Sequence, residues 1–330
     1  MTVEFDLFAE PSVARTSAIG RVEPAVHWFT ESTRAEASAS RETVNRWYRE
    51  IDDADGRFAQ RLRSEIDVDH YQALDELHIH HLLRTRHEDV RYEEGGVGPD
   101  FRVYDAGTCV GAVEVLSLFE RADWYREQQQ HARLAHDLDR RVRPTAGYFV
   151  DFQIKQCERD PAPRRFAKFV ARRIAELPDP QVLQLSQSPG PDDLPSAVYE
   201  HDDCLISIRF IPMPGGVAAR TDPDARIIGM GPMIGGMVNS ALRLKDRLVA
   251  KAGGKYELNG APFMVAACIH DFLCSDDQVL EALYGGEAVV VDTGHLARRR
   301  DGFFGIDEVS QVGRNTRVSA VGVIAGFTAW

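Results

Sequence analysis

The chain has 330 residues, of which 44% are hydrophobic and 27% charged, a mixture typical of globular proteins and not of disordered ones. Its apolar runs are shorter than the roughly 20 residues of a membrane span, and the first residues carry acids where a secretory signal has Lys or Arg, so we expect a cytoplasmic protein with no membrane partner. The net charge of -12 opposes non-specific binding to nucleic acid, although basic residues are in excess between Arg121 and Arg173.

The sequence pattern predicts an α/β protein in three parts. Residues 1–65 are predicted to be an N-terminal helical segment that precedes the core and contains one helix over 40–65. Residues 66–160 read as the core, in which a helix from His70 precedes three short strands, a polar helix over 122–143 and a strand over 146–156. The predicted core is therefore a helix, a three-stranded meander, a helix and a strand in a mixed sheet.

Residues 161–330 are predicted to form a C-terminal α/β extension packed on that core. It begins with a basic amphipathic helix over 162–178, whose charged side is expected to be a solvated face. The glycine-rich GMGPMIGGM lacks the Lys and Ser or Thr of a P-loop, so no nucleotide site is predicted. The five cysteines are scattered and include no C-x-x-C pair, so neither a disulfide framework nor a zinc knuckle is expected.

Two acidic residues stand out near the start and the end of a predicted hairpin. Asp100 precedes a strand, Glu114 lies between valines in the next strand, and Asp105-Ala106-Gly107 forms the turn between them. A buried, unpaired carboxylate is costly, and two converging carboxylates repel each other unless a cation neutralises them. Mg²⁺ or Mn²⁺, which prefer oxygen ligands, are the expected metals for this pair.

The stretch GPDF, a glycine-containing turn and VEV resembles the motif of the PD-(D/E)XK nuclease superfamily, and the helix ALDELHIHHLL is similar to the one that donates a further carboxylate in many members. DGFFG and RNTRVSAV further resemble a bacterial branch that lacks the usual ExK lysine. The resemblance implies a restriction-endonuclease-like fold and metal-dependent hydrolysis of DNA or possibly RNA. Asp100 and Glu114 would bind metal, and Glu76 would orient the ion or its waters.

This sequence departs from the family pattern where ExK places a lysine, because Leu116 occupies that position. Lys155 on the following strand is the first candidate for the missing cation, with Gln128 and Gln130 as further candidates on the intervening helix. A Lys155 ammonium within a few ångströms of Glu114 would favour catalysis, whereas an apolar environment would weaken that interpretation.

Other interpretations stay open at this point. The chain could be a nuclease-like protein without catalysis that serves as a nucleic-acid-binding or protein-interaction component, or a scaffold with no phosphate ligand. Asp100 could be an ordinary turn residue and Glu76 a solvated helix residue. The histidines His78, His80, His81 and His87 are expected to be exposed helix residues and not to bind zinc. A homodimer is possible, because many proteins with this fold pair to cut two strands.

Overall fold

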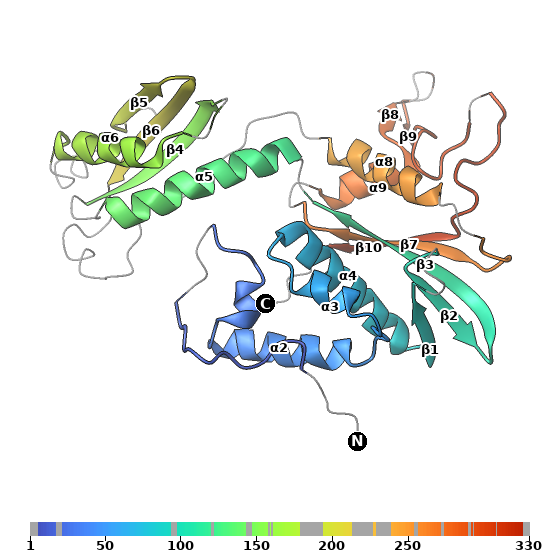
Figure 1. Cartoon of the computed structure of the whole chain (residues 1–330). Helices are drawn as coiled ribbons and strands as arrows, with labels where there is room; N and C mark the ends of the chain where they lie inside the picture. The colour runs from blue at the N-terminus through green and yellow to red at the C-terminus, as the bar shows by residue number, and fades with distance from the viewer. Residues whose placement is uncertain are drawn as a thin grey trace. The chain divides into compact units, whose positions relative to one another are not determined.

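The computed structural model describes residues 6–17, 22–93, 98–119, 122–142, 147–157, 159, 161–178, 194–212, 227–228, 239–253, 257–271, 274–289, 292, 294–307 and 309–325, without the side chains of 122–128. These residues form two compact units (Figure 1). The first comprises Met1–Ile19, Pro24–Glu120 and Met237–Trp330, and the second comprises Gly20–Glu23 and Arg121–Gly236. The chain therefore leaves the first unit and returns to it, in contrast to the expected consecutive parts divided near residues 65 and 160.

The first unit contains a five-stranded mixed sheet in the order β1-β2-β3-β7-β10. The strands β1, β2 and β3 form the predicted antiparallel meander, β7 runs parallel to β3, and β10 runs parallel to β7. Their bounds are Asp89–Tyr92, Phe101–Asp105, Thr108–Leu118, Phe263–Ile269 and Ala320–Ala325. The prediction of a mixed α/β fold is confirmed. The prediction that the strand over 146–156 continues this sheet is wrong, because β7 is the neighbour of β3.

Helices cover both faces of this sheet (Figure 1). The helix α4 (Asp67–Arg84) places Ile79 against Val113 and Val115 of β3, which point to one face. On the other face, α8 (Ser240–Ala252) and α9 (Asp276–Tyr284) pack against Leu116 and Leu118 of the same strand. Because both faces are covered, the second half of β3 is buried at every residue, and any charge there needs a partner.

The N-terminal part contains the short α1 (His27–Thr30) and two longer helices, α2 (Ala35–Tyr48) and α3 (Arg57–Leu62), in place of the single helix predicted over 40–65. Asp53 separates α2 from α3. Its carboxylate accepts hydrogen bonds from the backbone N–H groups of Phe58 and Ala59 and so starts a new helix. This break gives α3 its own direction, and it packs against α4.

Within its described residues, the second unit contains a three-stranded antiparallel sheet, in the order β4-β6-β5, and two helices. Its elements are α5 (Ala122–Arg141), β4 (Tyr148–Gln156), α6 (Pro163–Ala175), β5 (Ser196–His201) and β6 (Cys204–Pro212). Cys157 and Cys204 form a disulfide, although the scattered cysteines gave no expectation of disulfides. The pairing of Gln156 with Leu205 at the ends of β4 and β6 brings the two cysteines together across 47 residues of sequence.

The C-terminal part adds a small hairpin, β8 (Glu287–Val289) and β9 (Leu296–Arg298), followed by the DGFFG segment. A Cβ atom on Gly302 would lie 2.4 Å from the backbone nitrogen of Gly285, so the close approach of two chain segments requires glycine there. GMGPMIGGM lies outside the described residues. Among those described, no helix is both long and apolar enough to cross a membrane.

Candidate functional site

A tight turn and a β-bulge set the register that brings Asp100 next to Glu114. The turn residues Ala106 and Gly107 have φ values of 46° and 79°, as the two-residue hairpin turn that suits the twist of the strands requires. Asp105 pairs with Thr108, but the register shifts between Val103 and Tyr104, so that Phe101 pairs with Val113. The extra residue in β3 shifts all later pairs by one position. Asp100, just before Phe101, consequently lies opposite Glu114.

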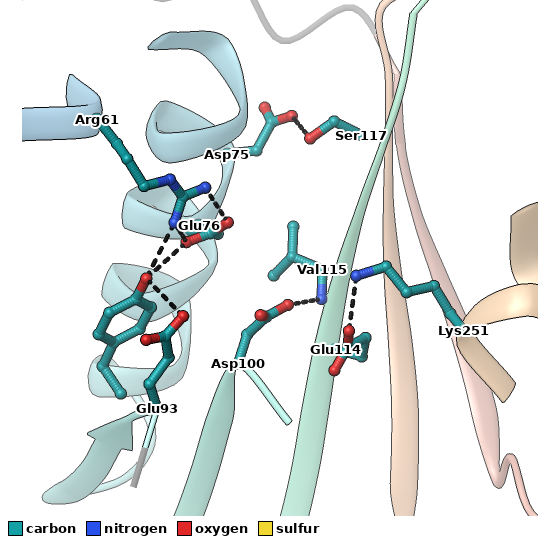
Figure 2. Close-up of polar contacts among 10 residues, drawn as sticks. Arg61, Asp75, Glu76, Glu93, Asp100, Glu114, Val115, Ser117 and Lys251 are labelled. Carbon is teal, nitrogen blue, oxygen red and sulfur yellow. Dashed lines mark hydrogen bonds and ion pairs between the residues drawn. The ribbon is translucent and has the colours of Figure 1, made fainter. Parts of the chain in front are cut away.

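Asp100 occupies a negatively charged environment between α4 and β3 (Figure 2). One carboxylate oxygen accepts a hydrogen bond of 2.6 Å from the backbone N–H of Val115. Burial, followed by the negative charges of Glu76 and Glu114, raises the pKa of Asp100 from 3.8 to about 7, although Lys251 and the Val115 N–H act in the opposite direction. The three predicted carboxylates are therefore close enough to interact electrostatically.

Glu114 forms an ion pair with a lysine that the sequence analysis did not identify. The Lys251 Nζ atom lies 2.6 Å from Glu114 Oε1, and the exposed fractions of the two side chains are 33% and 11% (Figure 2). Lys251 lies in the last turn of α8, seven residues after the buried Leu244 and therefore on the side of the helix that faces the sheet. The sequence signal that could have identified Lys251 is its spacing from the buried leucines of α8, which places it on the same side of the helix.

Glu76 is a buried residue of α4, and its carboxylate has its own cation. Arg61 of α3 makes two hydrogen bonds to its carboxylate, of 2.6 and 2.7 Å, and the hydroxyl of Tyr92 donates a third. This bidentate pair raises the pKa of Arg61. Its geometry fixes the orientation of Glu76, whose negative charge acts on Asp100. Neither Arg61 nor Tyr92 was predicted from the sequence.

A second polar network, next to Glu76 in sequence, connects α4 to the sheet. Asp75 is fully buried, and its Oδ2 atom accepts a hydrogen bond of 2.5 Å from Ser117 and lies 2.8 Å from the His270 Nε2 atom. Ser117 and His270 lie at the carboxyl ends of the neighbouring parallel strands β3 and β7. This network fixes the position of α4, and hence of Glu76, relative to the strand that carries Glu114.

The first unit does not include the cation candidates chosen from the sequence. Lys155 lies on β4 of the second unit, where its exposed side chain donates a hydrogen bond to Gln153. Gln130 is a buried residue of α5 in the same unit, and the side chain of Gln128 lies outside the described residues.

The prediction of exposed helix histidines is wrong for His80, which is 1% exposed. Burial lowers the pKa of His80 from 6.5 to about 4. His78 and His81 stack on the indole of Trp47 at ring distances of 5.4 and 4.8 Å. Packing between α2 and α4 therefore accounts for the positions of these two rings, which are partly buried.

The chemistry of Asp100 and Glu114 suits a divalent cation. Asp100 and Glu114 offer carboxylate oxygens, and Mg²⁺ is commonly held by one or two carboxylates together with water. A cation would also relieve the repulsion that raises the pKa of Asp100. The fit is limited to this pair, because no group of three or more His, Cys, Asp or Glu side chains within the described part of the chain is arranged to hold a metal.

Comparisons with known protein families, with curated proteins and with solved structures gave no match to this chain.

Proposed function

We propose that this chain is a metal-dependent phosphodiesterase that hydrolyses DNA or RNA, with a restriction-endonuclease-like core in its first unit. The observation that carries the proposal is the 2.6 Å contact between Lys251 and Glu114, beside Asp100. The sequence motif supplies two acids but has Leu116 in place of its lysine. A lysine from α8 supplies the missing positive charge from another element.

The order of elements supports the same core. If the second unit is treated as an insertion between β3 and α8, the first unit contains α4, then β1, β2 and β3, then α8 and β7. This is the succession of helix, three strands, helix and strand that the motif implied. The insertion also explains why the helix and strand that follow the meander in sequence do not complete the sheet.

Each side chain has a distinct role in this proposal. Asp100 and Glu114 would hold Mg²⁺ or Mn²⁺, which when bound supplies charge stabilisation and Lewis acidity to phosphodiester hydrolysis. Lys251 orients Glu114, and its ammonium group has further N–H donors for a phosphate oxygen. Glu76, oriented by Arg61, contributes negative charge that favours a cation at Asp100.

The experiment compares metal binding and cleavage in matched variants. Mn²⁺ is titrated calorimetrically into the wild type, Glu114→Gln and Lys251→Met, and the same samples are incubated with single- and double-stranded DNA and RNA. Lys155→Met is the control, because it removes an exposed lysine of the second unit. We expect wild-type cleavage to require metal and to fall at least about 100-fold in Lys251→Met, as for the loss of one positioned catalytic group. The control is expected to be unchanged.

Wild-type protein that neither binds Mn²⁺ nor cleaves any of the four substrates would refute the proposal. Full activity of Lys251→Met together with loss in Lys155→Met would assign the cation to β4 instead. The remaining candidate, a non-catalytic binding protein, is favoured by the pairing of Glu76 with Arg61 and of Glu114 with Lys251, because both acids already have counter-charges. Binding of nucleic acid without metal-dependent cleavage would select it.

A further inference from the structure

The helix α6 of the second unit has one apolar and one strongly basic side. Its apolar residues Phe166, Ala167, Val170 and Ile174 are buried in the core of that unit. The opposite side carries five exposed basic residues, and the helix contains no acid, in a chain whose net charge is -12. These residues, called here the basic face, are Arg164, Arg165, Lys168, Arg172 and Arg173.

Three members of the basic face form a regular stripe. Arg164, Lys168 and Arg172 follow one another at intervals of four residues and therefore lie along one side of the helix, over about 12 Å. Among the described residues none of the three has an ion-pair partner, whereas Arg173 pairs with Glu176 at 2.9 Å. The Arg172 guanidinium also lies 5.6 Å from the ring of Phe169. The stripe thus presents positive charge that the described acids of its own unit do not neutralise.

We propose that the basic face of α6 binds the sugar–phosphate backbone of a nucleic acid. The identification of the ligand as a substrate rests on the proposed phosphodiesterase function. A nucleic-acid strand carries one negative charge per phosphate, so each of the three cations of the stripe can neutralise one phosphate. Arginine and lysine contacts of this kind position a protein without reading the base sequence.

The packing of α6 favours nucleic acid over a membrane surface. A helix that lies on a bilayer inserts its apolar side between the lipids. In α6 that side is already covered, since Phe166 and Val170 are fully buried against the sheet of the second unit. Only the charged side is available, and it suits a ligand that offers phosphates and needs no apolar insertion.

The test measures binding by the full chain in EDTA, so that cleavage does not contribute. The anisotropy of fluorescent 20-mer single- and double-stranded DNA and RNA is followed at several salt concentrations. The test variant combines Arg164→Glu, Lys168→Glu and Arg172→Glu. The control combines Arg46→Glu, Arg86→Glu and Arg300→Glu, which reverse three exposed charges of the first unit and change the net charge equally.

We expect the α6 variant to lose about 100-fold in affinity near 0.1 M salt, and the slope of log K against log salt to decrease by about 2 to 3, because each lost phosphate contact contributes about 0.7 to 0.9. The control is expected to keep the wild-type slope. Circular dichroism and melting of both variants verify that the exposed substitutions leave the fold intact.

Equal affinity of the α6 variant and the wild type, an equal loss in the control, or no wild-type binding to any of the four oligonucleotides would overturn the inference. Wild-type binding to phosphatidylserine vesicles, lost in the α6 variant without an effect on nucleic acid, would assign the face to membranes and also overturn it. If nucleic-acid binding depends on α6 but no cleavage occurs in Mn²⁺, the phosphodiesterase function is refuted and this inference is retained.

Discussion

Substitution of Asp100 by Asn is expected to stabilise the protein at pH 8. The asparagine keeps an oxygen that accepts the hydrogen bond from the Val115 N–H, and it removes a charge from a site that already holds Glu76 and Glu114. In the folded protein the pKa of Asp100 is about 7, above its ordinary value of 3.8. Ionising Asp100 therefore costs more free energy in the folded protein than in the unfolded chain, and this difference lowers the stability of the fold.

The sign of the pH dependence follows from this order of pKa values. Between about pH 4 and pH 7 the folded protein holds a proton that the unfolded chain has released, so the contribution of Asp100 to stability is present at low pH and declines until about pH 7. The difference of about three pH units corresponds to about 4 kcal/mol. Because water reaches part of the side chain, we expect a measured gain of about 1 to 3 kcal/mol for Asp100→Asn at pH 8.

The assay is urea unfolding of the wild type and Asp100→Asn at pH 5 and pH 8, each with EDTA or with 5 mM MgCl₂. Asp105→Asn, at an exposed turn position of the same hairpin, is the control and is expected to have no effect. In EDTA the stabilisation by Asp100→Asn is expected to be larger at pH 8 than at pH 5. Mg²⁺ is expected to stabilise the wild type at pH 8 and not the variant. Destabilisation of Asp100→Asn at pH 8, or a gain that does not change with pH, would refute the electrostatic argument.

Two further substitutions test the supports of the site. Arg61→Met leaves the buried Glu76 carboxylate without its counter-charge and is expected to lower the free energy of unfolding by about 3 kcal/mol in urea. Adding Glu76→Gln to that variant should recover part of the lost stability. Additive losses of stability would contradict this pairing. Gly302→Ala places a Cβ atom 2.4 Å from a backbone nitrogen and is expected to cost at least about 2 kcal/mol, with a lower melting temperature, whereas Gly111→Ala meets nothing closer than 4.0 Å and serves as its control. Equal melting temperatures of these two glycine variants would show that the backbone adjusts at Gly302.

The hairpin that brings the two acids together was predictable, because its signal is local. The turn residues Ala106 and Gly107 separate two strand patterns by two residues, which is the signature of a tight hairpin. The bulge was not predictable from this turn. An unbroken ladder from Asp105 and Thr108 would place Val113 opposite Asp100, and the register shift in the structure places Glu114 there instead. A difference of one residue thus decides whether two carboxylates converge.

The misplacement of the fourth strand also has a physical cause. The segment YFVDFQIKQ alternates between buried and less buried residues, as a strand of an antiparallel sheet with one covered face does, and it forms β4 of the second unit. The segment FMVAACI is almost continuously apolar, as a strand covered on both faces requires, and it forms β7 beside β3. The difference in pattern favoured FMVAACI as the partner of β3, but proximity in sequence favoured the wrong segment.

The distribution of counter-charges indicates where a cation is needed most. Glu76 is paired with Arg61, and Glu114 is paired with Lys251. Among the described residues Asp100 has no ion-pair partner, and one of its carboxylate oxygens accepts a hydrogen bond from the neutral Val115 N–H. A cation would therefore relieve the least favourable environment at Asp100, whose pKa is raised by burial and by the negative charges of Glu76 and Glu114. We consequently expect Mn²⁺ affinity to depend more strongly on Asp100→Asn than on Glu76→Gln, and calorimetric titration of these two variants in parallel measures the difference. Equal loss of affinity in both would mean that Glu76 exchanges Arg61 for the metal.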